Sequence, residues 1–369
     1  MIGIADLHCD TLMKLWYARL RKDGLSLRGE NSQNAAKTEN TGNKESSLMV
    51  DLLKMKAGGY VLQNFACFVD MALPKDFNGK DGGSDFLNPS RSGEGYDPWE
   101  QFLGMAGVFR EEMERNTDLI GQVFCGADVR RNLAQGRMSA LLTIEEGGAL
   151  KGSLDHLESA YEAGVRMITL TWNYENELGF PNRMPEGADE DFRRYFRFRP
   201  ATGDGLKKRG FEMLERMQEL GILADVSHLS DGGFYDVAGF VKGPFVASHS
   251  NARSLTGCSR NLTDEMIRIV GEHGGVIGLN FCPHFLEEAD REDRCFSSLE
   301  AMARHARHIM NVGGAHVLGL GTDFDGIAPV NLEIENASGM QKLPDYLAGH
   351  GFSADEIEGM MYRNVLNIY

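Results

Sequence analysis

With 369 residues, the chain is long enough for one large α/β barrel or for two domains. Hydrophobic residues make up 42% of it, which supports a substantial core and excludes wholesale disorder. The formal net charge is −16, so the protein would repel the phosphates of nucleic acid. We therefore predict no nucleic-acid partner.

The six cysteines are scattered through the chain and include no Cys-x-x-Cys pair. Their spacing indicates neither a zinc knuckle nor a thioredoxin motif, and a chain of this size needs no disulfides, so we expect free thiols in a reducing compartment. No run of 18 apolar residues occurs, which predicts no membrane anchor. Because the N-terminus lacks the basic and apolar regions of a secretory signal, we predict a cytoplasmic protein.

Short apolar runs rich in β-branched residues recur along the chain and predict strands. In chain order, the eight predicted strands span residues 2–8, 60–69, 139–146, 166–172, 221–228, 244–249, 275–281 and 316–323. Between them, apolar residues recur at helical spacing over 98–115, 206–221 and 298–314. Gly221 is a natural helix terminator, and Ser298 is suited to cap the start of the third of these helices.

Strands that alternate with helices predict parallel pairing, because parallel neighbours need a crossover connection. Eight strands favour a single α/β domain over residues 1–369, a (β/α)8 TIM barrel. The alternative is an open doubly wound sheet, but no Gly-x-Gly-x-x-Gly sequence follows the first strand. Long polar insertions span 22–46, 71–97 and 173–204. We interpret the first as a surface loop and expect the other two to form the active-site rim.

Polar residues gather at the predicted carboxyl ends of the strands, where a barrel enzyme carries its chemistry. These residues are His8, Asp10, Glu145, Glu146, Trp172, Asn173, His228, His249, Asp323 and Asp325. Side chains two apart on a strand share a face, so His8 and Asp10 are expected to project together while Cys9 points the other way. Each of these histidines taken alone is as readily structural as functional.

Three histidines and two or three carboxylates converge if the strands close into a barrel, and this donor set suits Zn²⁺ or a similar divalent metal. One catalytic zinc uses fewer ligands, whereas two metals bridged by a carboxylate and a hydroxide would use them all. The remaining histidines on helical faces or beside glycines are interpreted as structural, and His284 is left open. In the loop after the sixth strand, Arg260 is suited to bind a fixed carboxylate, and Arg253 is an equal candidate.

Seven segments occur in the order and spacing of the renal (membrane) dipeptidase family, which the chain therefore resembles. The segments are DLHCDT, IEEGGAL, LTWNYENELG, DVSHLS, SHSNARSLTGCSRNLTDEMI, GLNF and GLGTDFDG. Members of that family are binuclear zinc dipeptidases of the amidohydrolase superfamily. The resemblance covers residues 2–369 and fails only in the long insertions.

The resemblance implies metal-binding roles for five residues. His8 and Asp10 match the ligands of a first zinc, and His228 and His249 match the ligands of a second. Glu146, directly before Gly-Gly, matches the carboxylate that bridges the two metals.

The resemblance also implies that Arg260 holds the C-terminal carboxylate of the dipeptide and that Asp323 is the acid/base aspartate near the bridging water. It implies no role for Glu145. Two positions depart from the family. Where some members carry a histidine on strand four, this chain has Trp172, and where they carry a tyrosine after Asn-Phe, it has Cys282. Both changes concern substrate binding and leave the metal ligands intact.

The resemblance implies a zinc-dependent dipeptidase in which a hydroxide bridging two Zn²⁺ ions attacks the peptide bond, with other divalent metals as alternatives. The sequence leaves open whether L-Xaa-D-Xaa dipeptides are substrates, and the resemblance suggests a homodimer. Trp172 and Cys282 motivate an alternative, another binuclear amidohydrolase acting on a small carboxylate-bearing amide, lactam or lactone. A catalytically silent binding barrel is the third hypothesis, against which the complete ligand set argues.

The pairing of His8 with Asp10 generates the first testable prediction. His8→Ala should lower the zinc content of the purified protein and leave the barrel folded, because the change removes a ligand and no large packing group. Elemental analysis and circular dichroism measure the two effects. If zinc content and activity both survive the substitution, the first strand is an ordinary one.

Overall fold

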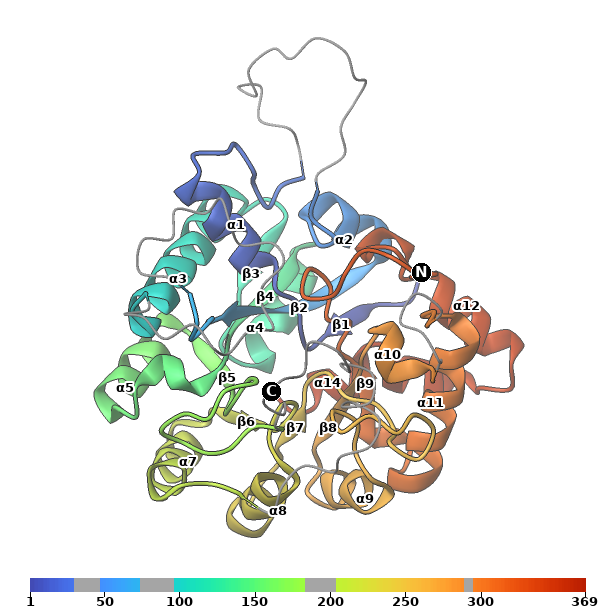
Figure 1. Cartoon of the computed structure of the whole chain (residues 1–369). Helices are drawn as coiled ribbons and strands as arrows, with labels where there is room; N and C mark the ends of the chain where they lie inside the picture. Colours follow the sequence, from blue (N-terminus) through green and yellow to red (C-terminus); the bar gives the residue numbers. More distant parts are fainter. Residues whose placement is uncertain (30–46, 74–95, 183–203, 289–294) are drawn as a thin grey trace.

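The computed structural model describes the chain except for residues 30–46, 74–95, 183–203 and 289–294. Its described part forms a closed barrel of parallel strands surrounded by helices, seen along the barrel in Figure 1. Most of each of the three predicted insertions lies outside the described residues. Their placement at the active-site rim therefore stays a prediction.

All strands of the sheet pair in parallel. Their bounds are β1 (Ile4–Asp6), β2 (Tyr60–Phe68), β3 (Ile120–Gln122), β4 (Met138–Glu145), β5 (Val165–Thr169), β6 (Leu223–Asp225), β7 (Val246–Ala247), β8 (Val276–Leu279) and β9 (Leu318–Leu320). The barrel closes because β1 pairs with both β2 and β9, and because β2 pairs directly with β4. Each of the eight predicted strands corresponds to one strand of this barrel, so the predicted TIM-barrel fold is confirmed.

The short strand β3 is not predicted from the sequence. It pairs only with the start of β4, where Ile120 lies opposite Met138, and it is not one of the eight barrel strands. Of its three residues only Ile120 is buried. Its sequence, Ile-Gly-Gln, contains no apolar run of the kind that predicts the other strands.

Helices cover the outside of the barrel. Their bounds are α1 (Thr11–Leu20), α2 (Leu52–Gly58), α3 (Pro98–Arg115), α4 (Gly126–Ala134), α5 (Leu154–Ala163), α7 (Lys208–Leu220), α8 (Asp231–Phe240), α9 (Asp264–Glu272), α10 (Pro283–Leu286), α11 (Leu299–Gly313), α12 (Lys342–Gly349), α13 (Ala354–Glu358) and α14 (Asn364–Leu366). Shorter helical turns are η1 (Gly147–Leu150), η4 (Ala315–Val317), η5 (Ala337–Gly339) and η6 (Gly359–Arg363). The predicted helix 98–115 has the bounds of α3. The predicted terminator Gly221 follows α7 with φ +72°, and the Ser298 side chain caps α11.

The helices bury one apolar face each against the strands. In α3, Phe102 and Phe109 are fully buried, and in α7 the buried side chains include Met213, Leu214 and Met217. Burying a side chain of this size contributes about 1.5–3 kcal/mol each, so these faces fix the helices on the barrel. The buried residues named here recur at the helical spacing from which these two helices were predicted.

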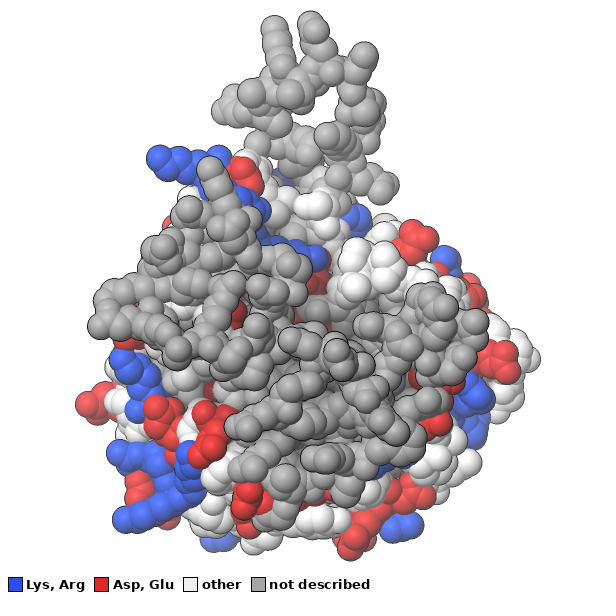
Figure 2. Space-filling model, in the orientation of Figure 1, with Lys and Arg blue, Asp and Glu red and all other residues white. Residues whose placement is uncertain are grey.

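The surface and the thiols agree with the composition. Figure 2 shows acidic and basic side chains intermingled over the described part of one face. None of the six cysteines forms a disulfide. Among the described residues, no helix is long and apolar enough to cross a membrane.

Two glycines let β7, β8 and β9 approach closely beside the barrel mouth. A Cβ atom on Gly278 would lie 1.9 Å from the carbonyl oxygen of Ser248, and a Cβ atom on Gly321 would lie 1.8 Å from the same oxygen. Any side chain at either position would push this backbone away. The two glycines therefore help to place His249, the residue that follows Ser248.

Gly278→Ala should destabilise the fold by about 1–3 kcal/mol, the usual cost of overpacking a core. Gly239→Ala is a matched control, because Gly239 lies in the exposed part of α8 with no atom within 4 Å of its would-be Cβ. The control should stabilise the helix by up to about 1 kcal/mol. Urea unfolding of both variants checks the prediction, and equal stabilities would contradict it.

Candidate metal centre

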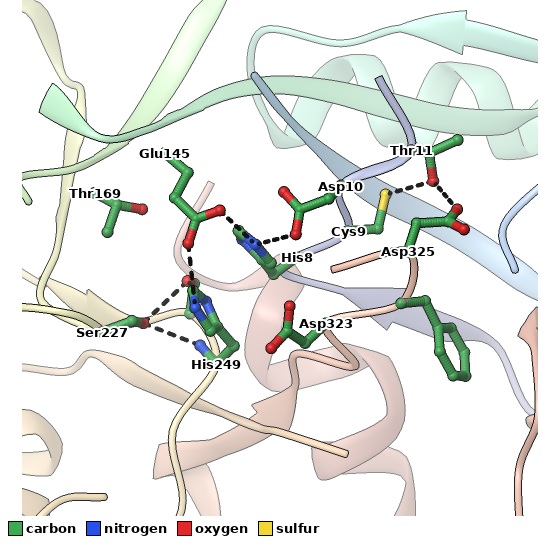
Figure 3. Close-up of polar contacts among 12 residues, drawn as sticks. His8, Cys9, Asp10, Thr11, Glu145, Thr169, Ser227, His249, Asp323 and Asp325 are labelled. Carbon is green, nitrogen blue, oxygen red and sulfur yellow. Dashed lines mark hydrogen bonds and ion pairs between the residues drawn. The ribbon is translucent and has the colours of Figure 1, made fainter. Parts of the chain in front are cut away.

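The end of β1 contributes His8 and Asp10, which both face the mouth of the barrel (Figure 3). Nε2 of His8 lies 3.6 Å from Oδ2 of Asp10, and both side chains are buried. Cys9 between them packs in the core, as predicted. The His8 ring also stacks on the His249 ring with centroids 4.0 Å apart, so residues that follow β1 and β7 meet here.

The structure corrects the prediction for the paired glutamates at the end of β4. Glu145 is the residue that faces the histidines, with its Oε2 3.3 Å from Nε2 of His8 and its Oε1 3.1 Å from Nε2 of His228. The same Oε1 lies 3.5 Å from Nε2 of His249 (Figure 3). The Glu145 carboxylate thus lies between His8 on one side and His228 and His249 on the other. The resemblance implies this position for Glu146.

Glu146 turns away from the histidines because the chain leaves the strand at this residue with φ +83°. Its carboxylate accepts hydrogen bonds from the backbone N–H groups of Gly148 and Trp172, both at 2.7 Å, and from the side-chain amide of Asn176. Glu146 therefore organises the loop after β4. Adjacent strand residues face opposite sides, and the sequence carries no signal for which of the two glutamates faces inward.

His228 and His249 approach each other through their Nε2 atoms, which lie 2.9 Å apart. Their Nδ1 atoms have separate partners, at 3.1 Å the Oδ1 of Asn173 for His228 and at 2.7 Å the Oγ of Ser248 for His249. Burial, together with nearby positive charge, holds the pKa of both rings well below the ordinary histidine value. Both rings are therefore neutral, which is the form that binds metals.

The carboxylates crowd negative charge into this buried space. Burial, together with the charge of Asp10, raises the pKa of Glu145 to about 8 and that of Asp323 to about 6. Burial lowers the pKa of His8, but the carboxylates of Glu145 and Asp10 outweigh it and raise that pKa well above its ordinary value. A bound divalent cation would favour the ionised carboxylates instead.

Two aspartates follow β9 and face different ways. The backbone at Asp323 and Asp325 has φ of +63° and +69°, a conformation that costs energy and is concentrated at functional sites. Asp323 faces the histidines (Figure 3). Its Oδ2 accepts a hydrogen bond of 3.0 Å from the side chain of Asn280. Asp325 accepts hydrogen bonds from the Thr11 hydroxyl and the Lys14 ammonium group, which fixes the turn to α1.

The two candidate arginines differ in what they contact. Both guanidinium Nη atoms of Arg253 lie 2.8 Å from the carboxylate of Asp231, a bidentate ion pair that ties the loop to α8. Arg260 is 3% exposed, yet its Nε and Nη1 have no hydrogen-bond partner. Its Nη2 makes a long hydrogen bond of 3.5 Å to the carbonyl oxygen of His249. Arg253 is thus a structural residue, and Arg260 carries donors available to a ligand.

Trp172 and Cys282 are both partly buried, on different sides of the site. The Trp172 ring packs against Phe68 and lies 6.0 Å, centroid to centroid, from the ring of His228. Cys282 is the N-cap residue that precedes α10, and its backbone N–H donates a 2.6 Å hydrogen bond to Oδ1 of Asn280. Trp172 thus lies next to a histidine of the centre, and Cys282 is linked to Asp323 through Asn280.

The residues present fit divalent metal ions. Two groups, His8–Glu145–His249 and His8–Asp10–Asp323, each offer three ligand atoms within 4.8 Å of one another. Nδ1 of His8 and Oδ1 of Asp10 are buried without a hydrogen-bond partner, although buried polar atoms normally have one. Imidazole nitrogen and carboxylate oxygen are ligands that zinc and related metals prefer.

The model of the membrane dipeptidase family, peptidase family M19, matches residues 1–369 of the chain. The chain belongs to this family. The predicted assignment as a metal-dependent dipeptidase is thereby confirmed.

Relatives and solved structures agree with the family. An uncharacterized dipeptidase of Schizosaccharomyces pombe is 30% identical over 327 residues, which are 86% of this chain and 71% of that protein. A metallopeptidase from Rhodobacter sphaeroides, solved with a phosphinate mimic of the dipeptide L-Ala-D-Ala, is 25% identical with a TM-score of 0.81 and covers 100% of this chain and 98% of its own. The dipeptidase AC of the same peptidase family has 25% identity and a TM-score of 0.79 over 100% of this chain and 97% of its own.

Because Glu145 faces the histidines and Glu146 faces away from them, the same substitution at the two positions should have different effects. Glu145→Gln should lower both metal content and activity, because an amide is a poorer metal ligand than a carboxylate. Glu146→Gln changes the same atoms one residue away and should keep the metal. Elemental analysis after dialysis measures both variants. Loss of metal from the Glu146 variant alone would contradict the placement of Glu145.

Proposed function

We propose that this dipeptidase works with two Zn²⁺ ions at the barrel mouth. One ion would be held by His8 and Asp10, the other by His228 and His249, with Glu145 between them. The position of Glu145 carries the proposal, because its two oxygens lie near histidines on opposite sides. Other divalent metals accept the same ligands and are alternatives to zinc.

Two bound metal ions would polarise the scissile carbonyl group and lower the pKa of a water molecule near it. The chain supplies the surroundings that this chemistry needs. Glu145 is 2% exposed and His8 is fully buried, so electrostatic interactions at the centre are weakly screened. The buried rings and carboxylates also fix the ligand positions before the substrate arrives.

Asp323 is proposed as the general acid and base of the reaction. It faces the ligands, and the side chain of Asn280 holds its Oδ2 in place. Burial raises the pKa of Asp323, which favours the uptake of a proton by its carboxyl group. It would receive the proton of the attacking water and pass it to the leaving amine.

Arg260 is proposed to bind the C-terminal carboxylate of the substrate. Its guanidinium group is buried beside the carbonyl oxygen of His249, and two of its three nitrogens lack a partner. A carboxylate accepts two parallel hydrogen bonds from such a group. Because the charge is buried at a fixed place, a peptide longer than two residues would place its carboxylate elsewhere, and this limits the enzyme to dipeptides.

Trp172 and Cys282 are proposed to be substrate-binding residues. The indole N–H of Trp172 can donate one hydrogen bond but cannot take up a proton, so it can orient a substrate and not act as a base. The phosphinate mimic of L-Ala-D-Ala bound to the Rhodobacter sphaeroides relative supports L-Xaa-D-Xaa dipeptides as part of the substrate range. A cytoplasmic location and a homodimer remain predictions of the sequence.

A dipeptide panel tests the function. Zinc-loaded protein should hydrolyse L-Xaa-L-Xaa or L-Xaa-D-Xaa dipeptides and lose this activity with a chelator. The same dipeptides with an amidated C-terminus should react at least about 100-fold more slowly, because the Arg260 charge would stay buried without its partner. Amine release measured by chromatography gives the rates.

The control is restoration of activity when zinc is added back after chelation. Protein that holds its full metal content and turns over no dipeptide would contradict the proposal. Equal rates for free and amidated dipeptides would contradict the role of Arg260 alone.

A further inference from the structure

Asp225, the last residue of β6, is a fully buried carboxylate beneath the histidine pair, and the proposed mechanism gives it no role. Five hydrogen-bond donors converge on it. They are the hydroxyl groups of Thr169, Ser227 and Ser248 and the backbone N–H groups of Ser227 and Ser248. With this many donors on two oxygens, the carboxylate acts only as an acceptor.

The Ser248 hydroxyl connects this carboxylate to the His249 ring. Ser248 Oγ donates a 2.6 Å hydrogen bond to Oδ2 of Asp225 and lies 2.7 Å from Nδ1 of His249. A hydroxyl group has one hydrogen, and the carboxylate can only accept, so that hydrogen is committed to Asp225. Ser248 Oγ must then accept from His249, which places the ring hydrogen on Nδ1 and leaves a lone pair on Nε2.

We propose that Asp225 is a positioning residue that, through the Ser248 hydroxyl, keeps the His249 hydrogen on Nδ1 and the Nε2 lone pair directed at a metal ion. This role rests on the metal centre proposed above. Carboxylate partners of metal-binding histidines fix the tautomer and the ring orientation, and their loss typically weakens metal binding by about 10–100-fold. Here a serine is inserted between the carboxylate and the ring.

The two histidines of the pair are supported differently. Nδ1 of His228 meets the amide oxygen of Asn173, a partly exposed residue, at 3.1 Å. The partner of His249, the Ser248 hydroxyl, is fully buried and is hydrogen-bonded to the charged Asp225 carboxylate. His249 is therefore the ring whose tautomer depends on the interior of the barrel.

Ser227 provides a matched control for Ser248. Its Oγ donates to Oδ1 of Asp225 at 2.7 Å. The same Oγ accepts from the backbone N–H of His249 at 3.1 Å and lies 3.1 Å from the Oγ of Ser248 (Figure 3). Both serines are buried and both bind Asp225, but only the Ser248 hydroxyl contacts the ring nitrogen of His249. Removing either hydroxyl leaves four donors on the carboxylate.

Asp225→Asn is expected to reverse the relay while it preserves the side-chain shape. Oδ1 of Asp225 receives two backbone N–H groups, which cannot reverse, so the new amide nitrogen must take the place of Oδ2. That nitrogen would donate to Ser248 Oγ, whose hydrogen would then turn to Nδ1 of His249. The ring hydrogen would move to Nε2, the atom that faces the metal, as in the carboxylate-to-amide change of a serine-protease triad.

The test is zinc affinity of the chelator-stripped full chain, titrated with Zn²⁺ against a competing chromophoric chelator, with thermal unfolding of each metal-free protein in parallel. Ser248→Ala should weaken one of the zinc sites about 10–100-fold, and Asp225→Asn at least as much. Ser227→Ala should bind zinc nearly as the parent protein does. The metal-free Ser248→Ala and Ser227→Ala proteins should have similar melting temperatures, because each loses one hydroxyl on the same carboxylate.

Equal zinc affinities for Ser248→Ala and Ser227→Ala would overturn the proposal, as would an unaltered affinity of Asp225→Asn. If Ser248→Ala does not fold, the comparison of Asp225→Asn with Ser227→Ala decides by the same criteria. If instead the parent protein binds no zinc, the proposed metal centre is wrong, and so is the positioning role of Asp225 that depends on it.

Discussion

The carboxylate of Glu145 meets three imidazole rings in a space that solvent barely reaches, and the site is arranged around this contact. Buried polar groups are costly unless they are paired, and buried charges more so. Here two Nε2 atoms face each other, and several donor atoms have no partner in the protein. This arrangement costs folding free energy, and the protein tolerates that cost because the same groups form a cation site.

The backbone adopts strained conformations at a few of the residues around this site. Glu146, Asp323 and Asp325 all adopt positive φ, and all three lie at the strand ends that form the mouth. Close packing adds a second constraint, since Gly278 and Gly321 allow no side chain against the carbonyl oxygen of Ser248. Local strain and tight packing therefore appear where ligand positions are set, while the outer helices follow ordinary capping and burial rules.

Much of the fold could be predicted because its signals are local. Short apolar runs rich in β-branched residues predicted the eight barrel strands and helical spacing predicted the bounds of α3, while β3 is too short to carry such a run. The strand ends also marked His8, Asp10 and the histidine pair as neighbours. The choice between Arg253 and Arg260 was open in the sequence, because it depends on the Asp231 partner that the folded loop supplies.

The sequence by itself determined the barrel, the family and the kinds of side chain at its mouth, because these depend on residue type, spacing and order. The tertiary structure decided which way individual side chains point. It placed Glu145 rather than Glu146 among the histidines, since the turn that ends β4 selects which of two adjacent side chains faces inward. It also joined Asp225, Ser248 and His249 from two neighbouring strands, and a contact between strands has no local pattern by which a sequence could reveal it.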